Sequence, residues 1–194
     1  MSNKGPLDLA IQIATILDDL NIAYALGGSL ASSLVGEPRS TIDVDMAAQL
    51  ESSTIEIFLE KLPNEIYVPL DSVKSAVKFN SSFNLIDIEN SLKIDIFVCS
   101  DDTLDTQQIK RRVLIDLPGR DYKLWVTSPE DQVLRKLNWY LLSNKALGKQ
   151  ISDVIGVLKI NKNTIDIKYM IEQSKTLGLY KLLMQVLEQS DIIV

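Results

Sequence analysis

Two stretches of the chain alternate strictly between apolar and polar residues, which is typical of a β-strand with one buried face. In "TIDVDMAAQ" this alternation puts Asp43 and Asp45 opposite the apolar side chains, and in "SLKIDIFVCS" it puts Lys93 and Asp95 there. Shorter apolar runs, "NIAYALGG", "EIYVPL" and "YKLWVTS", predict further strands. The stretch "AVKFNSSFNLIDIEN" indicates strands and turns, with at most a short helix near Ser72, and residues 101–120 show no clear pattern.

Apolar residues spaced three and four apart predict helices elsewhere in the chain. In the N-terminal part they indicate helices at 6–20 and 53–62, and a short one in "SLASSLVG", where Ser29 suits the N-cap and Gly36 the C-terminal stop. Near the C-terminus they predict four helices, at 129–144, 149–158, 164–176 and 179–190.

The order of these elements predicts the fold class. We expect an α/β (α+β) protein with a mixed β-sheet and flanking helices over about residues 1–125. A helical part over residues 126–194 follows and is expected to pack on it. Its first helix lies in "TSPEDQVLRKLNWYLL", where Ser128 and Asp131 can form a capping box.

The composition restricts the chemistry that the chain can perform. Its 194 residues suit one domain with a smaller appendage, and they include no histidine, which excludes a Ser-His-Asp triad and a His-ligated zinc site. The single Cys99 can form neither an internal disulfide nor a cysteine-cluster metal site, and its apolar surroundings favour a small buried hydrophobe. Carboxylates on a hard cation such as Mg²⁺ are the natural remaining chemistry.

The formal net charge of −6 argues against a protein that binds nucleic acid through a broad basic surface, although a local basic patch is compatible with it. No apolar run approaches membrane-spanning length, and the start "MSNKGPLDLAIQ" lacks the features of a signal peptide. We therefore expect a cytoplasmic protein that does not contact a membrane.

A strand that ends in Gly27-Gly28-Ser29 and enters a helix can form a seat for phosphate. Glycine lets the backbone approach a ligand closely, and the positive end of the helix dipole favours an anion. A tight strand-to-helix turn without a ligand explains the same residues equally simply.

Asp43 and Asp45 lie two residues apart on one strand, so both carboxylates point to the same side of the sheet. Two neighbouring like charges are unfavourable without a compensating cation, and two carboxylates together with nucleotide phosphates are a common way to hold Mg²⁺. The alternative is the solvent-facing side of an edge strand. Asp95 has the same setting between Ile94 and Ile96. If the two strands are neighbours, three carboxylates meet on one face; otherwise Asp95 is a surface residue.

These features together resemble the signature of the DNA-polymerase-β-like nucleotidyltransferase superfamily: Gly-Ser at a strand end, D-x-D on the next strand and a distant acid between apolar residues. "GGSLASSLVGEPRSTIDVD" is similar to a bacterial branch related to AbiEii-type toxins and small stand-alone nucleotidyltransferases, in which Arg and Thr precede the first Asp, here Arg39 and Thr41. "TSPEDQVLRKLNWY" resembles that branch's "SPEDLxxxKL" helix, with Lys136 at its lysine. "KQISDVIGVL" resembles the next helix, with Asp153 at its acid but without the arginine often found directly ahead of it.

The resemblance implies a Mg²⁺-dependent nucleotidyltransferase that moves a nucleoside monophosphate from an NTP to a hydroxyl acceptor and releases pyrophosphate. Asp43 and Asp45 would hold Mg²⁺, and Asp95 would complete the site for a second ion and assist deprotonation of the acceptor.

The resemblance also implies how the triphosphate is bound. The turn Gly27-Gly28-Ser29 would bind it, and Arg39 and Lys136 would neutralise its charge. A surface loop position for Arg39 and a solvated position for Lys136 on the flank of its helix explain these two residues as well.

Two classes of function stay open. An active enzyme would modify tRNA, a protein hydroxyl or a small hydroxylated molecule. A non-catalytic nucleotide-binding or interaction protein, one half of a toxin–antitoxin-like pair, is the alternative, and the presence of all three acids favours the enzyme. Trp139 lies opposite the apolar stripe of its helix, which indicates a contact surface for a partner protein or a second copy of the chain.

Overall fold

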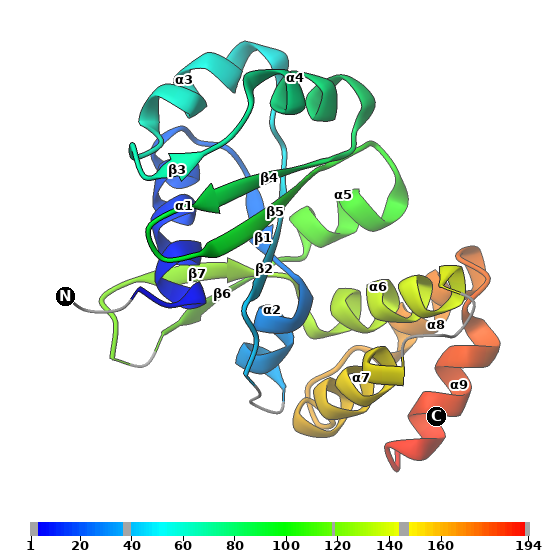
Figure 1. Ribbon diagram of the computed structural model, residues 1–194. Helices are drawn as coiled ribbons and strands as arrows, with labels where there is room; N and C mark the ends of the chain where they lie inside the picture. Colours follow the sequence, from blue (N-terminus) through cyan, green and yellow to red (C-terminus); the bar gives the residue numbers. More distant parts are fainter. Residues whose placement is uncertain (1–3, 37–39, 118, 144–147, 193–194) are drawn as a thin grey trace. The chain divides into compact units, whose positions relative to one another are not determined.

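In the computed structural model, which describes residues 4–36, 40–117, 119–143 and 148–192, strands and helices alternate up to Val126 and helices alone follow (Figure 1). The chain divides into two compact units, one made of the described residues of 1–30 and 41–127 and the other of those of 31–40 and 128–194. The helix α2 (Gly28–Val35) begins in the first unit and ends in the second. None of the described helices combines enough length and apolar character to cross a lipid bilayer.

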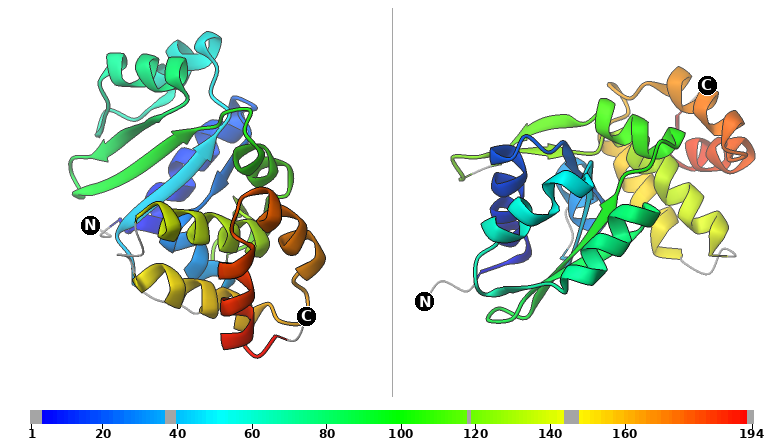
Figure 2. Two further views of the ribbon diagram at one scale, coloured as in Figure 1. Left: turned by 90° about the vertical axis from the view of Figure 1, so that its right-hand side faces the viewer. Right: turned by 90° about the horizontal axis from the view of Figure 1, so that it is seen from above.

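The first unit is built on a mixed sheet. In the described residues this sheet has seven strands in the order β3-β4-β5-β2-β1-β7-β6. Two neighbouring pairs, β2 with β5 and β1 with β7, are parallel, whereas β4 and β5 form an antiparallel hairpin (green in Figure 2). The strands are β1 (Tyr24–Leu26), β2 (Asp43–Ala48), β3 (Ile66–Tyr67), β4 (Ser82–Asp87), β5 (Leu92–Val98), β6 (Val113–Asp116) and β7 (Lys123–Val126).

One face of this sheet forms the core of the first unit. Val44 and Met46 on β2 and Ile94 and Ile96 on β5 are buried there, as the alternation in the sequence predicts. The helix α1 contacts β1, β2 and β5, and α4 contacts β4 and β5. The helices of this unit, besides the start of α2, are α1 (Pro6–Asp19), α3 (Ile55–Lys61, preceded by the 3₁₀ turn Ser52–Thr54), α4 (Leu70–Phe79) and α5 (Thr103–Lys110).

The opposite face is covered in part by α5. Ile109 on α5 packs against Ala25 on β1 and Ala47 on β2, and Cys99 is a partly buried neighbour of this cluster. Because successive strand residues point to opposite faces, Ala47 shares its face with Asp45. The helix α5 therefore closes one end of the face that carries the acidic residues.

The helix α4 is longer than the sequence pattern predicts, and the interpretation of 76–79 as strand and turn is wrong. Pro69 precedes the helix, and the Ser72 hydroxyl donates a hydrogen bond to the Pro69 carbonyl oxygen at 2.7 Å. Val73 and Ala76, three residues apart, bury one side of the helix. Asn80 then ends it with a left-handed φ of 46°. The strand β4 begins only after this stop.

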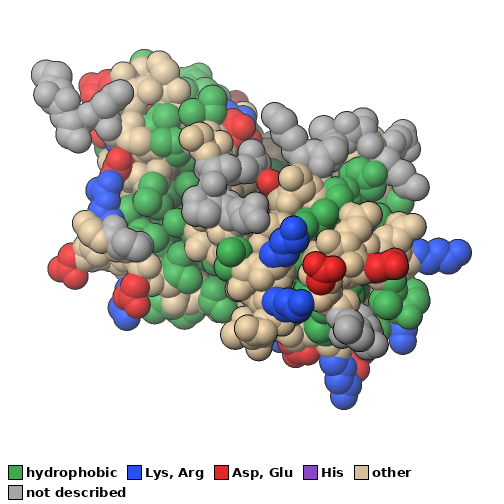
Figure 3. All heavy atoms as spheres, turned by 90° about the horizontal axis from the view of Figure 1, so that it is seen from below, with side chains coloured by type: hydrophobic (Ala, Val, Ile, Leu, Met, Phe, Trp, Pro, Cys, Tyr) green, Lys and Arg blue, Asp and Glu red, His purple; other side chains and the backbone are tan. Residues whose placement is uncertain are grey.

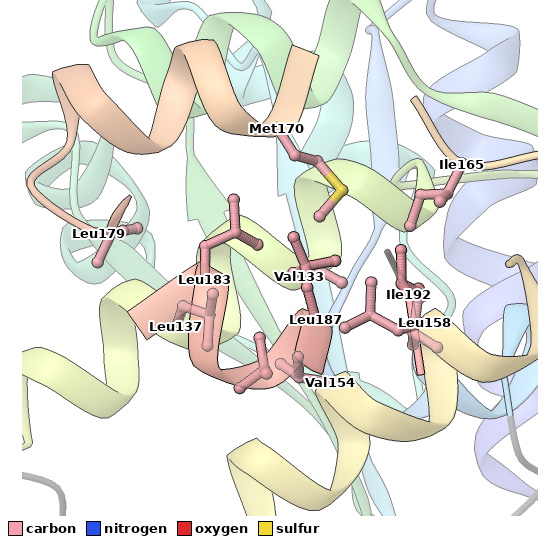
Figure 4. Packing of buried hydrophobic residues seen from close by; sticks show 12 residues of the cluster. Val133, Leu137, Val154, Leu158, Ile165, Met170, Leu179, Leu183, Leu187 and Ile192 are labelled. Atoms are coloured by element: carbon pink, nitrogen blue, oxygen red, sulfur yellow. The ribbon is translucent and has the colours of Figure 1, made fainter. Parts of the chain in front are cut away.

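The second unit is helical and has its own apolar core. Its helices, after the end of α2, are α6 (Pro129–Leu142), α7 (Gly148–Ile160), α8 (Ile167–Thr176) and α9 (Tyr180–Gln189). Twelve buried residues from these helices and their connections pack together (Figure 4): Val133, Leu137, Val154, Val157, Leu158, Ile165, Met170, Leu179, Leu183, Val186, Leu187 and Ile192.

The helix α6 begins with Ser128 as its N-cap, as predicted, and Ser128 and Asp131 form two hydrogen bonds with each other. The Asp131 amide donates to the Ser128 hydroxyl at 3.2 Å, and that hydroxyl donates to Asp131 Oδ2 at 2.8 Å. Asp131 Oδ1 accepts a hydrogen bond from the Tyr169 hydroxyl at 2.6 Å, and Glu130 accepts one from the Asp166 amide at 2.9 Å. Both buried acids of "SPED" therefore join α6 to α8.

A buried ion pair fixes the start of the described chain to the sheet. Lys4 Nζ lies 2.7 Å from Asp87 Oδ2 at the end of β4, and the Asn90 amide donates to Asp87 Oδ1 at 3.0 Å. Burial alone raises the pKa of Asp87, but the hydrogen bonds from Lys4 and Asn90 outweigh it and hold the pKa below the ordinary value. Asp87 is therefore a charged, fully buried anchor.

We expect Asp87→Asn to lower the free energy of unfolding at pH 7 by about 2 kcal/mol, because Lys4 loses a buried charged acceptor. The matched control is Asp116→Asn, whose exposed pair with Lys123 should contribute little. A lowered folded-state pKa stabilises above the unfolded pKa, so the gap between wild type and Asp87→Asn should shrink as the pH falls below about 4. Urea unfolding at several pH values measures this gap, and equal losses in both variants would contradict the prediction.

Candidate active site

The candidate active site lies where β2 and β5 run side by side. Their parallel register places Asp45 opposite Asp95 and Asp43 opposite Lys93. Side chains at opposite positions project to the same face, so Asp43, Asp45 and Asp95 meet on one face of the sheet. Asp43 is exposed, and the other two acids are half-buried. The adjacency that the three-acid hypothesis requires is therefore present.

The glycine turn adjoins these acids. The Gly27 amide donates to the Asp45 carbonyl oxygen at 2.8 Å. Gly28 has a φ of 60°, and a Cβ atom built on it would lie 1.9 Å from Asp45 Oδ2. Ser29 follows as the second residue of α2. Gly28 is thus required both by its left-handed backbone and by the space that the Asp45 carboxylate occupies.

Lys93 was not among the residues that the sequence predicts for the site. Its Nζ lies 2.8 Å from Asp95 Oδ2. The hydrogen bond to Asp95 raises the pKa of Lys93 most; burial opposes the rise, and the charges of Asp95, Asp43 and Asp45 add to it. The alternation in "LKIDIFV" already placed Lys93 on the face of Asp95, and that signal could have identified it.

The donor atoms suit a hard divalent cation, because Mg²⁺ prefers carboxylate oxygens. Asp95 Oδ1 is buried and accepts no hydrogen bond from any described residue, so it is an acceptor without a donor. Within the described ranges, however, no three acidic or thiol side chains converge as a ready-made metal site. Asp95 is paired with Lys93 instead, and the Asp45 carboxylate lies against Gly28.

Arg39 and Lys136 are the two basic residues that were predicted to neutralise phosphate. Arg39 lies outside the described residues. Lys136 belongs to the helical unit, where it is buried rather than solvated and donates to Asp153 Oδ2 at 2.8 Å and to Gln150 Oε1 at 3.4 Å. The side chains of Lys136 and Asp153 are 8% and 9% exposed. The two residues that the resemblance selects separately therefore form a buried ion pair between α6 and α7, and contact of Lys136 with phosphate stays a prediction.

No protein-family model and no curated protein sequence matches the chain. Its fold matches an antigenic nucleotidyltransferase-like protein from Paracoccidioides brasiliensis with a TM-score of 0.61 and 20% identity, over 95% of this chain and 88% of that one. The antibiotic-resistance factor ANT(2'')-Ia matches twice. Its solution structure has a TM-score of 0.50 and 15% identity, over 92% of each chain, and its complex with adenylyl-2''-tobramycin has 0.53 and 14%, over 88% of this chain and 95% of that one.

These identities are low, so the likeness establishes the fold. The protein has the nucleotidyltransferase-like fold, with a mixed sheet and flanking helices, and the predicted fold class is confirmed.

We expect Gly28→Ala to lower the free energy of unfolding by about 2 kcal/mol or more, because the new methyl group meets the Asp45 carboxylate at a strained φ. Gly27→Ala is the matched control, since a Cβ atom there meets Asp45 O and Thr127 Oγ1 at an ordinary 3.8 Å. Denaturant unfolding of both variants measures the difference. Equal stability of the two variants would show that Gly28 is not required by packing.

We expect Lys136→Met and Asp153→Asn each to destabilise the protein, the lysine variant by about 3 kcal/mol, because it removes the buried ammonium that faces the Asp153 carboxylate. The double variant should recover part of this loss. Chemical unfolding of the four proteins gives the coupling free energy. If Asp153→Asn unfolded like wild type, the ion pair would not be the role of Lys136, and a phosphate contact would gain weight.

Proposed function

We propose that this protein is a metal-dependent nucleotidyltransferase that moves a nucleoside monophosphate from an NTP to a hydroxyl acceptor. The observation that supports this most is the register of β2 and β5, which sets Asp45 opposite Asp95 with Asp43 on the same face. Three acids on one face, with a glycine turn against one of them, supply the groups that phosphoryl chemistry needs.

In the proposed reaction, different residues bind the triphosphate and accept the proton. The N-terminus of α2, entered through Gly27 and Gly28, favours the charge of the triphosphate. Asp95 accepts the proton of the attacking hydroxyl. The hydroxyl oxygen then bonds to the α-phosphorus, and the bond from that phosphorus to the β-phosphate bridging oxygen breaks, which releases pyrophosphate.

Mg²⁺ is the cofactor that these carboxylates suit, and when bound it supplies charge stabilisation for the entering and leaving oxygens. Asp43 and Asp45 would hold the first ion, and Asp95 would share a second. The buried Asp95 Oδ1, which no described residue's hydrogen bond reaches, supports this assignment.

The stretches from Gly28 to Asp45 and from Ser128 to Lys136 support a place beside the AbiEii-related branch. For the acceptor, a net charge of −6 and the interspersed acidic and basic side chains on the face in Figure 3 favour a small molecule over a long nucleic acid. A small hydroxylated acceptor also agrees with the adenylyl-2''-tobramycin bound to ANT(2'')-Ia, a protein of the same fold.

The test is transfer of label from each α-³²P NTP, with Mg²⁺, to three separate acceptor pools: tRNA, protein and small molecules that include tobramycin. We expect one NTP to label one pool, with tobramycin or another small molecule favoured. Asp45→Asn and Asp95→Asn should each reduce labelling at least about a hundredfold, because either change removes charge that stabilises the transition state.

The matched control is Asp116→Asn, which changes an exposed acid on the edge strand β6. The strands β1 and β7 separate β6 from β2, so this variant should label as wild type. Equal labelling by wild type and Asp45→Asn would contradict the proposed mechanism. Metal-dependent NTP binding without transfer to any pool would favour the non-catalytic, toxin–antitoxin-like alternative with a partner protein.

A further inference from the structure

Lys93 lies within the acid cluster. It precedes Asp95 by two residues on β5, so both side chains leave the same face, and it stands opposite Asp43 on β2. Its Nζ is 2.8 Å from Asp95 Oδ2. A lysine ammonium is therefore already bound to the carboxylate that the second metal ion would share.

The position of Lys93 reduces the electrostatic repulsion among the three carboxylates. Carboxylates that share one face of a sheet repel one another, and a nearby cation offsets that repulsion. The Asp95 side chain is 23% exposed, so water screens its charge only in part. Among the described residues, the Lys93 ammonium is a positive charge in direct contact with this carboxylate, at 2.8 Å.

The ion pair between Lys93 and Asp95 can also separate easily. The Lys93 side chain is 43% exposed, so its ammonium can leave Asp95 for water without being buried elsewhere. Lysine is a flexible point charge on a long aliphatic stem and does not form the rigid two-bond fork of arginine. An ion pair with this exposure stabilises a protein by at most about 1 kcal/mol, so a divalent cation can replace it.

We propose that Lys93 is an internal cation that offsets part of the negative charge of the three acids in the metal-free protein and is displaced from Asp95 when a divalent metal ion binds. The inference rests on the proposed function, since it concerns the same carboxylates. It makes Lys93 a positioning residue: its ammonium holds the Asp95 carboxylate on the acid face until the metal arrives. It also means that the metal-free site binds a divalent cation less tightly than the carboxylates alone would.

The test titrates Mn²⁺ into the full-length, metal-free protein without nucleotide and follows the signal of free Mn²⁺ by electron paramagnetic resonance. We expect Lys93→Met to bind Mn²⁺ about fivefold more tightly than wild type, because the competing ammonium is gone. The control is Lys123→Met, which removes a lysine paired with Asp116 on another pair of strands and should bind Mn²⁺ as wild type does. Equal or weaker binding by Lys93→Met would overturn the proposal.

A second measurement uses thermal unfolding with and without Mn²⁺. Lys93→Met should melt below wild type in metal-free buffer and gain more from Mn²⁺, whereas Lys93→Arg, which keeps the charge, should melt close to wild type. A metal-free melting temperature of Lys93→Met at or above that of wild type would also overturn the proposal. If wild type binds Mn²⁺ without a gain in Lys93→Met, the role of Lys93 alone fails; if no variant binds Mn²⁺, the proposed function fails as well.

Discussion

The parallel pairing of β2 with β5 is the constraint on which the candidate site depends. Val44 and Met46 on one strand and Ile94 and Ile96 on the other are buried on the same face of the sheet. A slip of one residue in β5 would turn its apolar side chains to solvent and its charged ones into the core. The hydrophobic core therefore fixes the register, and the register brings Asp45 opposite Asp95.

The same pairing brings the negative charges of Asp45 and Asp95 close together, and neighbouring residues accommodate them. Asp45 has room for its carboxylate because residue 28 has no side chain, and Asp95 has an ammonium partner in Lys93. The glycine at position 28 thus provides space for the Asp45 carboxylate, and the lysine at position 93 provides a positive charge beside Asp95. A cluster of acids that served only as a solvated surface would need neither a left-handed glycine against it nor an internal cation.

Local pattern predicted the features that depend on neighbours in sequence. The alternation along the strands predicted the shared face of Asp43, Asp45 and Asp95, and the sequence around Ser128 predicted this residue as the N-cap of α6. The sequence pattern did not predict features that depend on packing between residues far apart in the sequence. The buried pair of Lys136 with Asp153 joins residues 17 positions apart and exists because α6 packs on α7. The full length of α4 was not predicted, because its few apolar residues also fit a strand. The helix ends where Asn80 adopts a left-handed backbone conformation, which the pattern of apolar residues does not reveal.

In the proposed reaction, the acid face accounts for the chemistry but not for the choice of acceptor. The three carboxylates and the glycine turn would act on the triphosphate, which all NTPs share, so they cannot by themselves select an acceptor. Acceptor choice has to come from side chains that contact the acceptor's own hydroxyls and charges. Asn84, opposite Asp95 on β4, and Phe97, two residues beyond Asp95, share the acid face and are at least partly exposed. Both residues border the three acids without belonging to them, so a change at either position could alter the choice of acceptor while the chemistry of the three acids stays the same.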